Sequence, residues 1–313
     1  MQIGILEGDR FSEKAIHMLR SLGDVHVFAD EPLEQFLADK DVLFVRLGQH
    51  IDEALLALAP RLRVICSPTT GHTHFDEKAL AQKDVLLLSL RGERDFLQQI
   101  HATPEHTLGL ILSLLRNYRF AFLNMQNRDW DRDRYRGEGL SGKSVGIIGM
   151  GRVGKRVAQY LAAFEAPILF YDPDHNASYP GARRLDTIDA VLEGSDIVLL
   201  CASFALGSDP IIDRKRVGLL KGKYLVNTAR GELVDERALL EGIRLNWFKG
   251  VATDVIADET GAHRLDDWLR AAEGRNVIIT PHIAGATVDA MHTTEEFMVE
   301  KLIRTLQQQE AAG

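Results

Sequence analysis

Short runs of apolar residues alternate with helical patterns over the first ninety residues of the chain. The apolar runs are continuous, which is typical of strands buried on both faces of a parallel sheet. The segments between them repeat apolar residues three and four positions apart, as amphipathic helices do. The predicted strands are 2–6, 25–28, 42–45, 62–66 and 85–89, and the predicted helices are 11–22, 33–38, 52–58 and 75–82. This pattern predicts one complete doubly wound α/β domain.

A second series of strands begins after Ser144. Its predicted strands are 145–149, 168–172, 197–201, 224–227, 251–255 and 277–280, with helices between them. The polar stretch 127–142 is predicted to be a loop, and 287–309 a final helix. A long helix is expected over 104–123, with one apolar stripe formed by Leu108, Ile111, Leu112, Leu115 and Phe122. The chain should therefore fold into two doubly wound parallel-sheet domains of the α/β class.

Composition narrows the class of protein. The chain has 313 residues, of which 45% are hydrophobic, and this is enough for two packed cores. No apolar run reaches the length of a membrane span, and the first residues lack the basic region of a signal peptide. Cys66 and Cys201 lie in apolar runs and are interpreted as reduced thiols, so a cytoplasmic protein is expected. A net charge of −8 argues against nucleic-acid binding.

A glycine-rich turn follows the predicted strand 145–149. Gly149, Gly151 and Gly154 form a G-x-G-x-x-G pattern that opens a predicted helix. In dinucleotide-binding proteins these glycines permit a sharp turn, close approach of a pyrophosphate, and close packing of helix on strand. The helix would offer the free N–H groups of Arg152 and Val153 to the anion.

An acidic residue, Asp172, ends the next predicted strand. A carboxylate at this place accepts hydrogen bonds from the ribose hydroxyls of NAD and repels the 2′-phosphate of NADP. The predicted cofactor is therefore NAD, although Arg183 and Arg184 downstream keep NADP open. The alternative is a glycine-rich turn followed by a solvated aspartate.

Three chemically active residues follow other strands of the second series. Arg230, Glu259 and His282 each lie just beyond a predicted strand, at the sheet edge where doubly wound folds bind ligands. Arginine binds a planar carboxylate, histidine exchanges a proton near neutral pH, and a neighbouring glutamate favours the charged imidazole. Each residue alone has an ordinary structural interpretation; Arg230, for example, could pair with Glu232 or Asp235. Together they suit the reduction of a 2-oxo acid.

At this point several segments resemble a known family. The chain is similar to the D-isomer-specific 2-hydroxyacid dehydrogenases, which include phosphoglycerate, glycerate and lactate dehydrogenases. The segments that carry the resemblance are 71–76, 104–112, 140–154, 227–236, 254–259 and 280–287. The resemblance implies a Rossmann NAD-binding domain, residues 98–285, inserted into a flavodoxin-like substrate domain made of residues 1–97 and 286–313. It also implies a homodimer.

The resemblance further implies roles for single residues. Arg230 would bind the carboxylate and carbonyl of the substrate, and His282 would be the general acid in reduction with Glu259 as its carboxylate partner. Asp254 would approach the nicotinamide carboxamide, and Thr228 would lie along the cofactor. The adjoining Ala229 is placed with the same cofactor contacts.

The substrate-binding residues expected in the first domain are Thr70, Gly71 and Arg46. An arginine at the rim would favour substrates with a second anionic group, although a solvated surface arginine is an equal alternative. The loop 71–76 departs from the family pattern, and its His72 and His74 are interpreted as loop surface without a metal. The segment 201–205 and Thr260 also depart from that pattern.

The predicted function is reversible hydride transfer between NADH and a 2-oxo acid, giving a D-2-hydroxy acid. The alternative is a non-enzymatic NAD-sensing protein, like the transcriptional corepressors that share this fold and can keep the same residues.

Overall fold

The computed structural model describes residues 1–205, 207–259 and 264–312. Two compact units are present, one made of Met1–Ile100 and Ala286–Gly313 and the other of His101–Gly285. Each unit contains one parallel β-sheet with its own core. No helix in the described part of the chain is long and apolar enough to span a lipid bilayer. Thr260, one of the departures noted above, lies outside the described residues.

The first unit has a five-stranded sheet in the order β2-β1-β3-β4-β5, which is the flavodoxin-like order. Its strands are β1 (Gln2–Ile5), β2 (Asp24–Val27), β3 (Val42–Phe44), β4 (Val64–Ser67) and β5 (Leu86–Ser89). The helices that follow them are α1 (Glu13–Arg20), α2 (Leu33–Leu37), α3 (Glu53–Leu58), α4 (Glu77–Gln82) and α5 (Arg94–Leu97). All strand pairs are parallel, as the continuous apolar runs predicted.

The last helix of the chain, α13 (Val288–Ala312), belongs to this first unit. Its Met298, Val299 and Leu302 are fully buried in the same core as Ile3 and Phe44. The unit is therefore completed by a segment nearly two hundred residues away in the sequence from β5.

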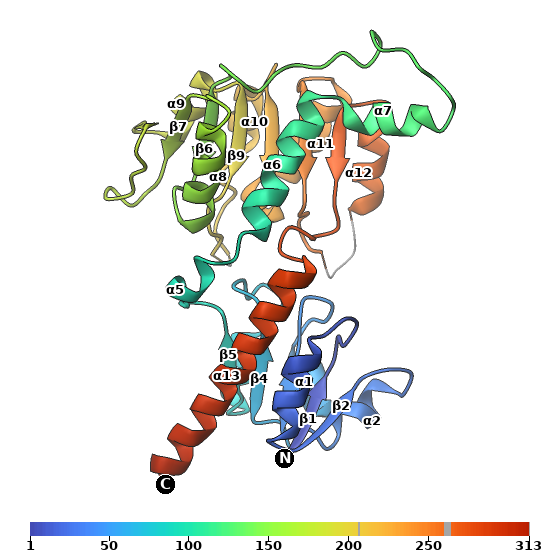
Figure 1. Ribbon diagram of the computed structural model, residues 1–313, viewed down its shortest axis with the longest axis vertical. Helices are drawn as coiled ribbons and strands as arrows, with labels where there is room; N and C mark the ends of the chain where they lie inside the picture. Colours follow the sequence, from blue (N-terminus) through green and yellow to red (C-terminus); the bar gives the residue numbers. More distant parts are fainter. Residues whose placement is uncertain (206, 260–263, 313) are drawn as a thin grey trace. The chain divides into compact units, whose positions relative to one another are not determined.

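The second unit has a seven-stranded parallel sheet in the order β12-β11-β10-β9-β6-β7-β8 (Figure 1). Its strands are β6 (Val145–Ile148), β7 (Ile168–Tyr171), β8 (Ala182–Arg184), β9 (Ile197–Leu200), β10 (Tyr224–Asn227), β11 (Gly250–Thr253) and β12 (Val277–Ile279). This is the Rossmann order with one further strand, and the strand order reverses between β6 and β9. The two doubly wound sheets that the sequence predicts are thus confirmed.

Helices cover both faces of the second sheet. One face is covered by α6 (Ala102–Leu115) and α8 (Arg152–Ala162), whose apolar side chains share a core. The other face is covered by α9 (Ile188–Gly194), α10 (Arg214–Leu219), α11 (Glu236–Arg244) and α12 (Leu265–Ala272), with the short 3-10 helix η1 (Gly231–Leu233) before α11. With both faces covered, the free edge of the strand ends is the place open to a ligand.

The prediction of a single helix over 104–123 was wrong in one respect. It is two helices, α6 and α7 (Tyr118–Met125), because Asn117 adopts a left-handed conformation with φ of 52° and changes the direction of the chain. The predicted apolar stripe therefore ends with α6, and Phe122 is 66% exposed. The loop predicted over 127–142 is confirmed.

Candidate active site

The turn after β6 is shaped by its glycines. Gly149 has a φ of +97°, and a Cβ there would lie 2.7 Å from the backbone nitrogen of Ala202. A Cβ on Gly154 would lie 2.2 Å from the carbonyl oxygen of Gly149, so helix α8 can pack this closely only on glycine. At Gly151, by contrast, nothing lies within 4 Å of where a Cβ would be. The open space beside Gly151 and the N-terminus of α8 fit a pyrophosphate, with the N–H groups of Arg152 and Val153 at its disposal.

Asp172 follows β7 and is half-buried. One of its carboxylate oxygens accepts a hydrogen bond from the N–H of Met150 at 2.7 Å, and the other from the N–H of Asp174 at 2.9 Å. Arg184 donates to the backbone carbonyls of Asp172, Asp174 and Ala177, so its guanidinium holds this loop together. Arg184 is one of the two arginines that could have favoured NADP, and its guanidinium already forms hydrogen bonds within this loop.

His282 and Glu259 come together as predicted from their places after β12 and β11. His282 Nδ1 lies 2.5 Å from Glu259 Oε2, and both side chains are partly exposed. The backbone of His282 is left-handed, with a φ of 54°, which is uncommon for a residue other than glycine. Because Nδ1 contacts Glu259, Nε2 is the ring nitrogen that does not face this carboxylate.

Arg230 follows β10 in a turn fixed by Asn227. The side-chain oxygen of Asn227 accepts from the N–H of Ala229 at 3.0 Å, and its amide donates to the carbonyl of Arg230 at 2.9 Å. Burial lowers the pKa of Arg230, while the charges of Glu259 and Glu232 act to raise it. Within the described residues Arg230 forms no ion pair, and its one side-chain hydrogen bond runs to the carbonyl of Ala229 at 2.6 Å.

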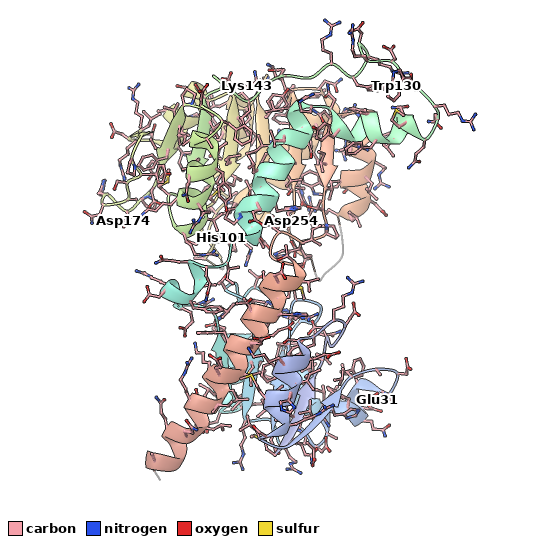
Figure 2. All side chains as sticks on the ribbon, in the orientation of Figure 1. Glu31, His101, Trp130, Lys143, Asp174 and Asp254 are labelled. Carbon is pink, nitrogen blue, oxygen red and sulfur yellow. The ribbon has the colours of Figure 1, made fainter. Side chains whose placement is uncertain are left out.

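Asp254 lies at the end of β11, at the edge of the sheet where α6 begins (Figure 2). It is 1% exposed, and burial opposes its ionisation. Hydrogen bonds from His106, Thr280 and the N–H groups of Ala284 and Ile283 outweigh burial and lower the pKa of Asp254. The group is therefore a carboxylate that is already saturated with donors.

Thr228 is buried and its hydroxyl is used within the unit. Its Oγ1 lies 2.8 Å from Oγ1 of Thr107 on α6, and Thr107 in turn donates to the carbonyl of Thr103. Since the hydrogen of Thr107 is committed to Thr103, Thr228 must be the donor to Thr107. A cofactor contact of the Thr228 side chain would therefore use its hydroxyl oxygen as an acceptor rather than this proton.

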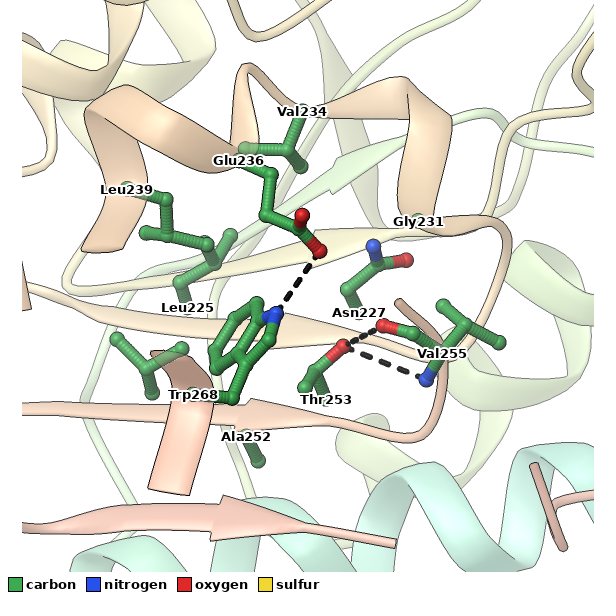
Figure 3. Close-up of a pocket in the computed structure, with 11 residues that line it drawn as sticks. Leu225, Asn227, Gly231, Val234, Glu236, Leu239, Ala252, Thr253, Val255 and Trp268 are labelled. Carbon is green, nitrogen blue, oxygen red and sulfur yellow. Dashed lines mark hydrogen bonds between the residues drawn. The ribbon is translucent and has the colours of Figure 1, made fainter. Parts of the chain in front are cut away.

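A buried glutamate supports the loop that carries Glu259 (Figure 3). Glu236 Oε1 accepts from the indole N–H of Trp268 at 2.8 Å and from the N–H of Ala257 at 3.1 Å. In Figure 3 the indole of Trp268 lies over the strands of the sheet, and its nitrogen points at Glu236 across a small pocket. The residue two positions before Glu259 in the chain is thus tied to α11.

The candidate residues of the first unit have different surroundings. Thr70 is exposed and Gly71 half-buried in the loop after β4. Arg46 follows β3, and its Nε and Nη2 lie 3.1 and 2.5 Å from the same carboxylate oxygen of Glu295. Glu295 lies on α13 and is fully buried. The surface-arginine alternative for Arg46 is wrong, because the guanidinium is held in an ion pair with a buried carboxylate.

The interpretation of His72 and His74 as loop surface is also wrong. His72 bridges Glu77 and Ser89 with hydrogen bonds of 2.8 Å from each ring nitrogen, and burial lowers its pKa. His74 is 3% exposed and packs against Phe75 with ring centroids 4.0 Å apart. Phe75 is buried together with His74. The polar composition of 71–76 did not indicate that this loop is partly buried. The part of the chain that the structure describes contains no cluster of side chains suited to a metal.

The sequence is similar to proteins of a known family. Residues 108–284 match the model of the D-isomer specific 2-hydroxyacid dehydrogenase, NAD binding domain. The chain is 30% identical to a D-3-phosphoglycerate dehydrogenase of Methanocaldococcus jannaschii over 97% of its length, but spans only 57% of that relative. It is 31% identical to a glyoxylate reductase of Thermofilum pendens, covering 94% of this chain and 88% of the relative.

A solved structure shows the same fold. A D-lactate dehydrogenase of Aquifex aeolicus, complexed with NAD and lactic acid, superposes with a TM-score of 0.81 at 25% identity, covering 98% of this chain and 96% of that one. The match to the NAD-binding domain confirms NAD as the cofactor expected from the glycine-rich turn and Asp172. Because the family model matches more than half of the chain and the glyoxylate reductase is similar over nearly all of it, the chain belongs to the D-isomer specific 2-hydroxyacid dehydrogenase family.

Proposed function

We propose that this protein is an NAD-dependent dehydrogenase that reversibly reduces a 2-oxo acid to a D-2-hydroxy acid. The observation that carries the proposal is the 2.5 Å contact between His282 and Glu259. Arg230, which forms no ion pair with a described residue, follows β10, the strand next to β11 in the same sheet. An acid–base pair and a carboxylate-binding cation at one sheet edge are what this reaction requires of a protein.

Each of the three side chains has a distinct task in reduction. NADH, when bound, supplies the hydride. The carbonyl oxygen gains negative charge as C2 is reduced, and His282 delivers a proton to it from Nε2, because Nδ1 faces Glu259. The negative charge of Glu259 favours the protonated ring and fixes its orientation. In oxidation His282 takes the proton back.

Arg230 binds the carboxylate of the substrate in this proposal. A guanidinium presents two parallel N–H donors that match the two oxygens of a carboxylate. Thr70 and Gly71, in the loop after β4, are likewise proposed as substrate contacts. Arg46 is the least suited of the expected contacts, since Glu295 already neutralises its charge.

A panel of 2-oxo acids offered with NADH tests the activity. The panel should contain short, branched and aromatic acids and acids with a second anionic group, since the substrate class is open. We expect consumption of NADH with at least one of them. The corepressor-type alternative, which the enzyme names of the relatives do not favour, predicts NADH binding with no consumption on any acid.

Asp172 is expected to select NADH over NADPH. The 2′-phosphate of NADPH would lie against the half-buried carboxylate of Asp172 and be repelled by it. Removing the negative charge of Asp172 should therefore weaken this repulsion. For Asp172→Asn, which keeps the shape of the side chain, we expect the ratio of kcat/KM for NADPH to that for NADH to rise about tenfold or more. Asp174→Asn, at an exposed residue two positions further along the chain, is the matched control. Wild-type protein that uses NADPH as well as NADH would contradict this assignment.

The homodimer is likewise a proposal, supported by an exposed apolar surface on the second unit. Phe122, Leu123, Met125 and Trp130 on α7 and the loop after it are 66%, 52%, 45% and 87% exposed. In Figure 1 this segment extends beyond the sheet instead of packing on it. Apolar patches of this kind usually mark a protein interface.

Light scattering after gel filtration tests the dimer. We expect a dimer for the wild-type protein and a monomer for the double variant Phe122→Glu with Trp130→Glu. Leu245→Glu, at a residue 56% exposed at the end of α11, is the control and should stay dimeric. A double variant that elutes as the wild type would exclude this surface as the interface.

A cytoplasmic location is proposed from the two thiols. Cys66 and Cys201 are both free, and burial raises the pKa of Cys201 to about 12. Unpaired buried thiols are usual in reducing compartments.

A further inference from the structure

Asp254 accepts hydrogen bonds from three consecutive residues of the segment that carries His282. The N–H of His282 donates to the backbone carbonyl of Asp254 at 2.8 Å. The N–H groups of Ile283 and Ala284 donate to the two carboxylate oxygens of Asp254 at 2.9 and 2.8 Å. Three consecutive backbone donors thus converge on Asp254, and this convergence sustains the left-handed conformation of His282.

The carboxylate of Asp254 is in turn fixed by a polar chain from α6. Thr280 donates its hydroxyl hydrogen to Asp254 Oδ1 at 2.5 Å. His106 Nε2 lies 3.1 Å from the same hydroxyl oxygen and 3.4 Å from Asp254 Oδ1. Because Thr280 has only one hydrogen to give, its oxygen must accept from His106, and Nε2 therefore carries a proton.

We propose that His106 is a positioning residue, which acts through Thr280 and Asp254 to hold His282 in its working orientation. The inference rests on the proposed function for its effect on turnover, but the contacts it describes exist without cofactor or substrate. Among the described residues the polar contacts of the His106 ring are with Thr280 and Asp254, so its effect on His282 passes through them. Its ring is 20% exposed, so the hydrogen bond to Thr280 is partly shielded from competing water.

Removing the donor should loosen the segment without unfolding the protein. For His106→Leu we expect the amide hydrogens of residues 282–284 to exchange about fivefold to tenfold faster, measured by mass spectrometry on the protein without cofactor. We expect kcat for 2-oxo acid reduction to fall about tenfold with little change in the KM for the acid. His106→Gln, which can place an N–H near the position of Nε2, should restore most of both.

The controls separate this role from a general effect on helix α6. The Ser113 hydroxyl on the same helix donates a hydrogen bond to the backbone carbonyl of Gly109. Ser113→Ala removes this bond and should change neither the amide exchange of residues 282–284 nor kcat. If His106→Leu does not fold, Thr280→Val and Thr280→Ser make the same comparison, since only serine keeps the hydroxyl. The double variant His106→Leu with Thr280→Val should lose no more than the more damaging single change, because both interrupt one chain.

The outcome for this inference is distinguishable from that of the proposed function. Unchanged exchange at residues 282–284 in His106→Leu would overturn the inference whatever the turnover. A glutamine variant no better than the leucine variant would overturn it as well. If the wild-type protein reduces no 2-oxo acid but the exchange rises as expected, the proposed function fails and the positioning role stands.

Discussion

Replacing His282 with alanine is expected to lower kcat for 2-oxo acid reduction by about 10²–10⁴-fold, the usual contribution of a general acid. The side chain is partly exposed and its backbone is held by Asp254, so the change removes a proton donor and leaves the segment in place. Titration with NADH should give a Kd close to that of the wild type, since the glycine turn and Asp172 are untouched. Steady-state kinetics with the best acid of the panel give the ratio.

The control for this prediction is Glu259→Gln. Glutamine can keep a hydrogen bond to Nδ1 but loses the charge that favours the protonated ring, so we expect a loss smaller than that of His282→Ala. Near-normal turnover in His282→Ala would show that another group supplies the proton. A loss of NADH binding along with kcat would point instead to a disturbed fold.

Replacing Arg230 with alanine is expected to differ in kind. The guanidinium would meet the substrate carboxylate in the ground state and as the reaction proceeds, so both a higher KM for the oxo acid and a lower kcat should result. Loss of a bidentate, charge-assisted pair corresponds to a fall in kcat/KM of about 10²-fold or more. NADH affinity measured by fluorescence should change little.

Arg230→Lys provides the matched comparison. Lysine keeps the charge but lacks the planar fork, so its kcat/KM should lie between those of alanine and wild type. Because burial disfavours the charged form of Arg230, the variant should also be checked for a change in melting temperature. An alanine variant whose KM equals that of the wild type would contradict the role in carboxylate binding.

Much of the fold follows from the apolar runs alone. All eleven strands expected from the sequence overlap observed strands by three residues or more, because strands buried on both faces leave an uninterrupted apolar signal. The strand β8, Ala182–Arg184, escaped prediction because it lies at the edge of the sheet and contains two arginines. The break at Asn117 escaped because the helical spacing of apolar residues continues across it.

The site was predictable where residues follow strands and unpredictable where they support other residues. His282 and Glu259 could be placed together because the ends of parallel strands share one edge. His106 and Glu236 lie on helices α6 and α11, and nothing in their local sequence shows that one contacts Thr280 and the other Trp268. Arg46 also follows a strand, but its charge is paired with the buried Glu295 of helix α13. Its place after a strand did not reveal this partner.

The proposed activity is the transfer of a hydride to C2 of a 2-oxo acid, which gives the D product. The hydride can be followed by reduction of the best 2-oxo acid with NADH that carries deuterium at both C4 positions, with chiral chromatography and mass spectrometry of the product. We expect a D-2-hydroxy acid that carries one deuterium at C2 and that forms far more slowly with His282→Ala. An L product, or a product without deuterium at C2, would contradict it.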